Sequence, residues 1–274
     1  MSVVDSPVPR LGLGTWQNTD PEQCVESVRT ALEAGYRHID TAQLYDNETL
    51  VGDGVRAADI DREAVYLATK VLHPRAVEER SAGLDRGQVR AAVEACLDRL
   101  GVDSVDLTYV HWPAAWDLDL VHTELAACRD DGLVDGVGVS NYEPEHLEAA
   151  LDVDPAIVAN QVECHPLLPQ ADLRGYCADV GVDVVAYAPL AHGSVFEVPE
   201  LEAVADERGV SVPRVTLSWL LEIGVAPVPK ATGAAHIRDN LAAQELELTD
   251  DERARIDSIE RAERFFDPEY APDW

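Results

Sequence analysis

Lysine is almost missing from this chain of 274 residues, where it occurs only at Lys70 and Lys230. Acidic side chains number 52 against 21 basic ones, and the formal net charge is −31. Because such a surface repels polyanions, it excludes nucleic acid and anionic lipid as partners. Nearly all the positive charge is arginine, so each lysine is a candidate for a specific role.

Targeting and crosslinking signals are absent as well. No apolar run approaches the roughly 18 residues of a membrane span, and residues 1–10 lack the apolar region of a signal peptide. We therefore expect a cytoplasmic protein without a membrane partner. The five cysteines, at positions 24, 96, 128, 164 and 177, are odd in number and contain no C-x-x-C pair. This pattern argues against a disulfide framework or a zinc site and favours buried free thiols.

The acid excess has a second consequence, which concerns salt. At about 1 M ionic strength the Debye length is roughly 3 Å, so repulsion that strains the fold in dilute buffer is screened. We hypothesise a halophilic source and expect a monomer. Full structure and activity in salt-free buffer would contradict the halophilic hypothesis.

Strand patterns alternate with amphipathic helix patterns along the whole chain. After a short strand segment before residue 15, a helix is expected between its cap Asp20 and Gly35, followed by a strand over 36–40. Further strands are expected at 64–70, 105–111, 134–140, 156–161, 182–188 and 224–229. Further helices are expected at 47–57, 86–100, 117–131, 144–151, 170–180, 198–207, 211–221 and 234–243.

A last helix, from the capping box of Thr249 and Glu252 to about residue 261, precedes a C-terminal tail. Alternating strands and helices pair in parallel, and eight such units close into a barrel. The sequence therefore predicts an α/β fold, a single (β/α)8 TIM barrel over residues 1–274. In such a barrel the loops that follow the strands share one face.

The stretch YRHIDTAQLYDNE, residues 36–48, carries a candidate acid/base site. Asp40 ends a strand and needs a cation there, because an unpaired carboxylate is costly in a packed interior. Lys70 ends the next strand and is placed to supply that cation. We expect Lys70 to lower the pKa of Tyr45 from about 10, so that Tyr45 can act as a general acid.

His111 completes the set, since it ends the strand over 105–111. A neutral imidazole there could orient a substrate carbonyl towards Tyr45. Taken singly, each residue has a structural alternative: Asp40 with Lys70 as an ion pair, Tyr45 as a loop anchor, and His111 as a barrel-end histidine.

The segment HIDTAQLYDNE (38–48), the strand ending in Lys70 and HWP (111–113) resemble the aldo-keto reductase family. The likeness runs from GLGTWQ (12–17) to the C-terminal PDW. The family's members are (β/α)8 barrels that reduce carbonyls with a nicotinamide cofactor and no metal. The resemblance implies that Tyr45 donates the proton, that Lys70 and Asp40 tune it, and that His111 orients the carbonyl.

A nicotinamide cofactor needs groups that read its amide and a flat surface on which to stack. Ser140, Asn141 and Gln161 end successive strands and could bind the carboxamide, while Tyr187 could stack on the ring. Ser140 or Asn141 could equally cap the helices that follow. The glycine pairs at 12/14 and 136/138 lack the third glycine of a dinucleotide fingerprint, which excludes a Rossmann fold.

The segment VPKATGAAHIRDN, residues 228–240, contains Lys230 and resembles the part of the family that holds the adenosine phosphate of NADPH. Ala231 and His236 stand where the family often has serine and arginine. Because histidine is mostly neutral at pH 7, His236 weakens the case for strict use of NADPH. We expect NADPH, with NADH as the alternative. The resemblance implies further cofactor-binding residues: Thr15, Asp40, Pro189, Leu190, Ser194, Thr232, Asp239 and Asn240, with Asp239 and Asn240 facing the adenine. In the loop over 189–194, Ala191 replaces a common glycine.

Trp16 and Trp112 flank the expected site together with Tyr45 and His111, and are candidates for binding a small carbonyl substrate. The aromatic tail ERFFDPEYAPDW could wall the pocket or seal the barrel rim, and we prefer the second interpretation. The tail resembles that of short prokaryotic members such as diketogluconate and methylglyoxal reductases. It suggests a small aldehyde, a keto acid or a keto-sugar as substrate.

Two functions from other classes were weighed against the reductase. A cofactor-binding redox sensor or partner subunit could use the same barrel with negligible turnover, but it needs no general acid such as Tyr45. A metal-dependent hydrolase could use Cys164, His165 and His111, but the ligand spacing is not typical of a metal site.

Overall fold

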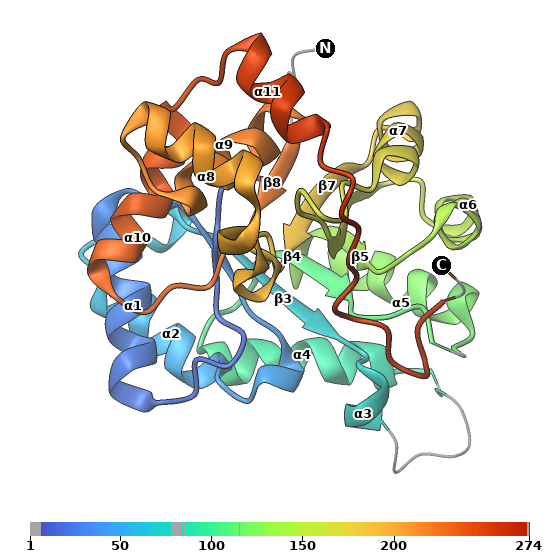
Figure 1. Cartoon of the computed structure of the whole chain (residues 1–274). Helices are drawn as coiled ribbons and strands as arrows, with labels where there is room; N and C mark the ends of the chain where they lie inside the picture. The colour runs from blue at the N-terminus through green and yellow to red at the C-terminus, as the bar shows by residue number, and fades with distance from the viewer. Residues whose placement is uncertain (1–6, 78–83, 85, 115, 273) are drawn as a thin grey trace.

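The computed structural model describes residues 7–77, 84, 86–114, 116–272 and 274. Its sheet has eight parallel strands in the sequential order β1 to β8. The strands are β1 (Leu13–Gly14), β2 (His38–Asp40), β3 (Tyr66–Val71), β4 (Val105–Val110), β5 (Val134–Ser140), β6 (Ile157–Glu163), β7 (Asp183–Tyr187) and β8 (Val225–Pro227). Helices surround this curled sheet (Figure 1), so the predicted (β/α)8 barrel is confirmed.

The chain closes the barrel between its first and last strands. The amide of Gly12 donates to the carbonyl of Pro227 at 3.0 Å, and that of Gly14 to Pro229 at 3.1 Å. A Cβ atom at Gly14 would lie 2.5 Å from the carbonyl oxygen of Val228. Only glycine allows the two backbones to approach so closely, which explains the glycine-punctuated first strand.

Apart from the short α3, which was not predicted, the α-helices lie where the apolar periodicity predicts them. They are α1 (Pro21–Ala34), α2 (Glu48–Ala57), α3 (Pro74–Val77), α4 (Gln88–Leu100), α5 (Leu118–Asp130), α6 (Pro144–Val153), α7 (Ala171–Val180), α8 (Pro199–Arg208), α9 (Val212–Glu222), α10 (Ala234–Leu241) and α11 (Asp250–Asp257). Short 3-10 helices are η1 (Gln43–Tyr45), η2 (Arg62–Ala64), η3 (Ala191–Glu197) and η4 (Ala242–Glu245).

The helix-capping predictions for α1 and α11 agree with the structure, whereas α4 begins at Gln88 after Gly87, without the predicted capping box of Asp85 and Gln88; residue 85 lies outside the described residues. The carboxylate of Asp20 accepts the amide of Gln23 at 2.9 Å, and α1 ends at Gly35 with φ 120°. The capping box of Thr249 and Glu252 begins α11. That helix ends at Asp257, however, earlier than the predicted residue 261, and the chain that follows it runs across the face of the barrel (Figure 1).

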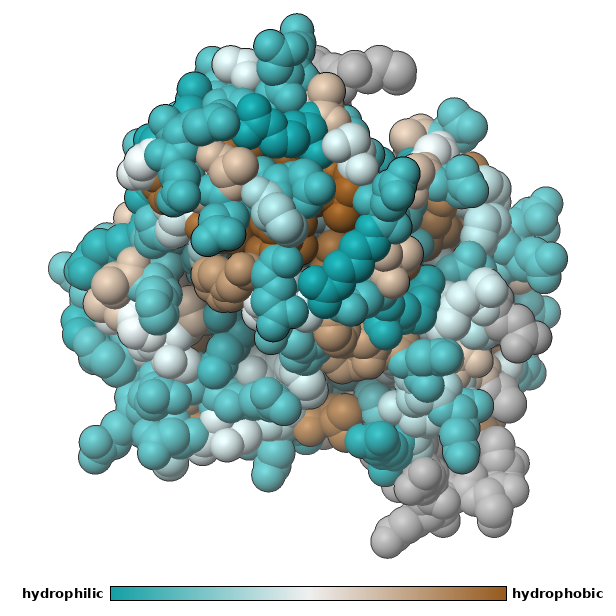
Figure 2. All heavy atoms as spheres, viewed as in Figure 1, coloured by the Kyte–Doolittle hydropathy of each residue, from teal (hydrophilic) through white to brown (hydrophobic). Residues whose placement is uncertain are grey.

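Two apolar regions form the core. The smaller one fills the barrel itself and consists of Val8, Ala68, Leu107, Tyr109, Ala159, Val185 and Val228. The larger one packs the helices onto the outside of the strands, as both faces of a parallel sheet require. The surface is mostly hydrophilic, and the hydrophobic residues of the face in Figure 2 gather towards its centre. Among the described residues, no helix is both long and apolar enough to cross a bilayer.

Candidate active site

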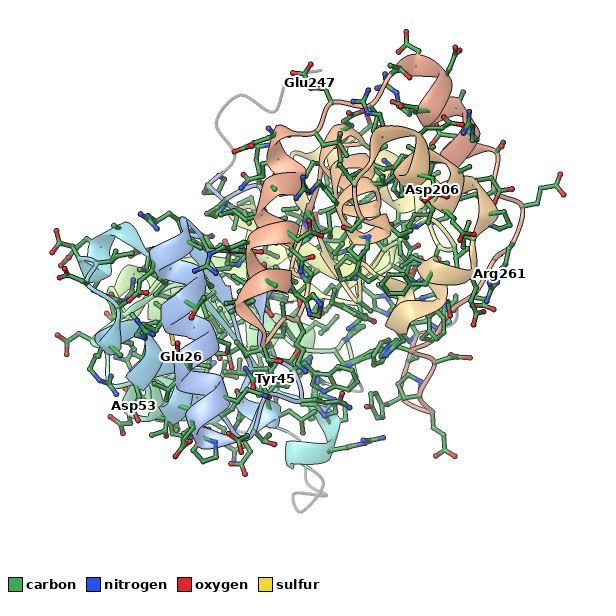
Figure 3. All side chains as sticks on the ribbon, turned by 60° about the vertical axis from the view of Figure 1, so that its left-hand side comes forward. Glu26, Tyr45, Asp53, Asp206, Glu247 and Arg261 are labelled. Atoms are coloured by element: carbon green, nitrogen blue, oxygen red, sulfur yellow. The ribbon has the colours of Figure 1, made fainter. Side chains whose placement is uncertain are left out.

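A cavity of about 610 Å³ opens at the carboxyl ends of the strands. Of the predicted site residues, its walls contain Thr15, Trp16, Asp40, Tyr45, His111, Trp112, Ser140, Asn141, Gln161, Tyr187, Pro189, Leu190 and Lys230. They come from strand ends and loops that are far apart in sequence, as barrel topology predicts. Tyr45 lies within the fold, whereas acidic side chains such as Asp53 and Glu247 lie at its periphery (Figure 3).

Asp40 and Lys70 form a buried ion pair behind the cavity wall. Lys70 Nζ donates to Asp40 Oδ1 and, at 3.0 Å, to the carbonyl of Thr41. Gln161 Nε2 donates to the second carboxylate oxygen, Asp40 Oδ2, at 2.7 Å. Burial lowers the pKa of Lys70, and the charge of Asp40 acts in the opposite direction. The predicted pairing is therefore present, and Asp40 is the group that holds Lys70 in its charged form.

Tyr45 lies close to this pair but titrates differently from the prediction. Lys70 Nζ lies 5.1 Å from the centroid of the Tyr45 ring. Burial raises the pKa of Tyr45 well above 10, and the negative charge of Asp40 raises it further. The expected net lowering is wrong for this structure, because burial of the phenol and the charge of Asp40 raise the pKa by more than Lys70, paired with Asp40, lowers it.

His111 lies beside Tyr45, with a ring-centroid separation of 5.9 Å. Burial lowers the pKa of His111 well below 6.5, and the charge of Lys70 contributes in the same direction. The imidazole is therefore neutral at pH 7, as expected from the sequence. Its Nδ1 atom is buried and has no hydrogen-bond partner among the described residues.

The strand-end polar groups form one network along the cavity wall. Tyr187 Oη donates to Asn141 Oδ1 at 2.8 Å, Asn141 Nδ2 donates to the carbonyl of His111 at 3.2 Å, and Ser140 Oγ donates to the carbonyl of Gln161 at 2.8 Å. Neither Ser140 nor Asn141 caps α6, whose N-cap is Glu143. The capping alternative is wrong, and these side chains face the cavity instead.

The expected nucleotide-binding residues divide into two groups. Lys230 belongs to the cavity wall, whereas Ser194, Thr232, His236, Asp239 and Asn240 lie outside it. His236 is exposed. The carboxylate of Asp239 accepts Arg214 Nη2 at 2.6 Å and also contacts Ser211, so it joins α10 to α9 rather than standing free to face an adenine.

The C-terminal tail does more than the preferred interpretation allowed. Phe265, Phe266, Pro268 and Tyr270 all belong to the cavity wall. The Phe266 ring lies 5.5 Å from Trp16 and 5.2 Å from Tyr187. The tail therefore walls the pocket, and its assignment as a rim seal alone is wrong.

Sequence reasoning missed several further residues of the wall, among them the ring and cationic side chains of His73, Arg75 and His192. His73 Nε2 lies 3.3 Å from Tyr270 Oη, and its ring lies 4.7 Å from that of His111. Burial, reinforced by Arg75, lowers the pKa of His73 to about 4. The signal was available, because HPR (73–75) begins three residues after Lys70, in the loop that follows this strand on the active face.

The residues of the hydrolase alternative have other partners. The Cys164 thiol lies 3.7 Å from the carbonyl of Pro169, and His165 Nε2 lies 3.0 Å from Glu163 Oε1. In the part of the chain that the structure describes, no group of three or more His, Cys, Asp or Glu side chains could hold a metal ion.

Comparisons with known proteins identify the family of this chain. The profile of the Aldo/keto reductase family matches residues 10–261. This chain belongs to that family. An aldo-keto reductase of Mycobacterium sp. (strain JLS) is 39% identical over 262 residues, which cover 94% of this chain and 91% of the relative. The glyoxal reductase of Bacillus subtilis (strain 168) is 34% identical over 258 residues, or 94% and 91%.

The fold of this aldo/keto reductase family member also matches solved structures. The crystal structure of a putative 2,5-diketo-D-gluconic acid reductase B superposes with a TM-score of 0.88 at 31% identity, covering 97% of this chain and 94% of that one. Members of the family are oxidoreductases that act on carbonyl compounds. The chain is therefore assigned to that class of enzyme.

Proposed function

We propose that this family member reduces an aldehyde or ketone to the alcohol with NADPH, and that Tyr45 donates the proton. The observation that carries the proposal is the convergence of Asp40, Tyr45 and His111 on one cavity, with Lys70 paired to Asp40 behind its wall. These are the groups that carbonyl reduction needs, since the oxygen gains negative charge as the carbon gains a hydride.

Each side chain has a defined part in this proposal. A reduced nicotinamide, when bound, supplies the hydride. The neutral His111 binds the carbonyl oxygen and orients it, and Tyr45 donates its phenolic proton to that oxygen. The charge of Lys70 stabilises the phenolate that Tyr45 becomes, and Asp40 keeps Lys70 protonated. The raised pKa keeps Tyr45 protonated at neutral pH but also makes the phenol a weaker acid, so the proposal requires Lys70, 5.1 Å from the ring, to stabilise the phenolate.

The residues of the wall fit a nicotinamide dinucleotide. Ser140, Asn141 and Gln161 present amide and hydroxyl groups, Tyr187 presents a ring, and Lys230 supplies a cation at the other side of the cavity. In a chain with a net charge of −31, a lysine in the wall favours an anionic group such as a phosphate. We propose NADPH as the cofactor. NADH is the alternative, because His236 offers no guanidinium for the adenosine phosphate that distinguishes NADPH from NADH.

We propose a small aldehyde, a keto acid or a keto-sugar as the substrate. The names of the relatives, a glyoxal reductase and a putative diketogluconic acid reductase, support small polar carbonyls. Arg75 supports the keto acid, since it lines the cavity and has no ion-pair partner among the described residues. A guanidinium in this place could hold a carboxylate in a bidentate pair.

The test is cofactor oxidation in molar salt, with NADPH and NADH compared on methylglyoxal for wild type and Tyr45→Phe. We expect turnover in the wild type and a loss of about 10²–10⁴-fold in kcat for the variant. His236→Arg should increase the preference for NADPH. Cofactor binding without turnover on a broad panel of carbonyls would instead support the redox sensor.

A further inference from the structure

Glu163 is a buried carboxylate behind the part of the cavity wall that Phe265 and Phe266 form, and the proposed reaction does not use it. It is the last residue of β6 and lies two positions after Gln161, on the same side of the strand. Its side chain is 0% exposed. Among the described residues its ion-pair partner is His165, and no lysine or arginine lies within ion-pair distance.

Three N–H groups surround the Glu163 carboxylate. Phe265 N donates to Oε1 at 2.8 Å, Phe266 N donates to Oε2 at 2.9 Å, and His165 Nε2 lies 3.0 Å from Oε1. Hydrogen bonds from backbone amides compensate a buried carboxylate for the loss of water. Each oxygen of the Glu163 carboxylate therefore accepts one backbone amide of the tail, from Phe265 and from Phe266.

These two bonds are a large part of what fixes the tail. Within the described residues, the backbone of residues 262–268 makes one other hydrogen bond to the barrel, from Glu263 N to the carbonyl of Leu167 at 2.9 Å. In its described part, residues 258–272 and 274, the tail forms no strand or helix that could hold it. Among the described residues, Glu163 thus accepts two of the three backbone hydrogen bonds that join this segment to the barrel.

The position of the tail determines the size of the pocket. Beyond the anchored amides, the Phe266 ring packs against Trp16 and Tyr187. Tyr270 packs on Trp112 with a centroid separation of 5.3 Å, and its hydroxyl meets His73. If the tail moved outward, these aromatic side chains would leave the wall of the cavity.

We propose that Glu163 is a positioning residue that limits the size of the carbonyl substrate by anchoring the C-terminal segment over the pocket. This inference rests on the proposed reductase function. It predicts that loss of the anchor widens the pocket, so that bulky aromatic carbonyls gain access while methylglyoxal loses part of its binding surface. Glu163 itself touches neither substrate nor cofactor in this account.

Glu163→Gln tests the proposal because it keeps the size of the side chain but replaces one acceptor oxygen by an amide that repels a backbone N–H. We expect kcat/KM for cinnamaldehyde relative to methylglyoxal to rise about tenfold, equivalent to about 1.4 kcal/mol. Hydrogen exchange of the peptide that contains Phe265 and Phe266 should also become faster. Glu163→Asp, which keeps the charge but shortens the side chain, is the second variant if Glu163→Gln does not fold.

The matched control is Asp154→Asn. Asp154 is another buried carboxylate, bound by Arg129 at 2.8 and 3.0 Å between α5 and α6, away from the cavity wall. The Asp154→Asn variant should lose stability, but its kcat/KM ratio for the two aldehydes and the hydrogen exchange of the tail should not change. A folded Glu163 variant that behaves like this control would overturn the proposal.

The two levels of inference fail in different ways. If wild type turns over no carbonyl, the reductase function is wrong and the size limit fails with it, but exchange still shows whether Glu163 holds the tail. If wild type is active and the tail loosens while the selectivity ratio stays constant, only the size-limiting role is wrong.

Discussion

One wall of the cavity carries Asp40 and His111 at the ends of strands and Tyr45 in the short helix η1 that follows β2. Another wall is the extended segment from Phe265 to Tyr270. Every strand end is fixed on both sides by its neighbours in the sheet, and the Lys70–Asp40 pair joins β3 to β2 directly. The tail instead depends on a few hydrogen bonds to Glu163 and Leu167.

The rigid wall holds the groups proposed to carry out the reaction, whereas the tail is proposed to select the substrate. Groups that transfer or orient a proton must be held within a fraction of an ångström, and a barrel provides this rigidity. Groups that only exclude large substrates tolerate movement. Substitutions in the first wall should therefore stop the reaction, whereas substitutions that affect the tail should change only which substrates bind and how tightly.

The largest effect is expected for Lys70→Met. Lys70 and Asp40 are 1% and 3% exposed, so removal of the lysine leaves a buried carboxylate without a cation. We expect a loss of about 3–5 kcal/mol in the free energy of unfolding. The loss in kcat should be about 10²–10⁴-fold, because Tyr45 loses the charge that stabilises its phenolate. Chemical denaturation in molar salt and steady-state kinetics measure the two effects.

The double variant Asp40→Leu/Lys70→Met is the control for that experiment. Replacing a buried pair by apolar side chains is often neutral for stability, so most of the stability should return while activity stays lost. If activity returned with stability, the pair would be structural and would have no part in the reaction.

The two walls also differ in how far the sequence predicts them. Asp40, Lys70, His111 and Gln161 were found because each ends a strand pattern, and parallel strands bring their ends to one face. The tail lacks a periodic pattern, and its anchor at Glu163 is 102 residues away from Phe265 along the chain. Only the folded structure brings the two together.

The titration of Tyr45 was mispredicted for a related reason. The sequence identifies Lys70 as a neighbour and therefore predicts a lowered pKa. It does not show that Asp40 balances the lysine, nor that the walls of the cavity remove water from the phenol, and burial is the larger effect. Contacts between residues that are distant in sequence decide whether the pKa of Tyr45 rises or falls.

The next largest effect concerns pH. Burial lowers the pKa of His38, His73 and His122 to about 4, whereas the unfolded chain binds protons near pH 6.5. The unfolded state therefore binds more protons between these values. Above about pH 7 the three histidines should leave the free energy of unfolding unchanged. As the pH falls from 6.5 to 4, together they should lower it by up to about 4 kcal/mol per pH unit.

The pH prediction distinguishes the two walls through His38 and His73. His38 belongs to β2 beneath the strand-end wall, whereas His73 contacts Tyr270 of the tail. His38→Gln and His73→Gln should each remove about a third of the slope measured by denaturation at a series of pH values. Acid should accelerate hydrogen exchange of the tail in wild type but not in His73→Gln. An acid response of the tail that survives in His73→Gln would assign it to another group.

The smallest effect is expected for Tyr270→Phe, which removes the hydrogen bond to His73 and leaves the aromatic packing on Trp112. Loss of one such bond costs about 0.5–1.5 kcal/mol, so KM should rise by roughly two- to tenfold while kcat is unchanged. Tyr36→Phe is the matched control, because the hydroxyl of Tyr36 bonds the carbonyl of Ile237 at 3.1 Å away from the cavity wall. Both variants should lose similar stability, but only the tail variant should change KM. A fall in kcat for Tyr270→Phe would mean that the tail takes part in the reaction and that the division between the two walls is wrong.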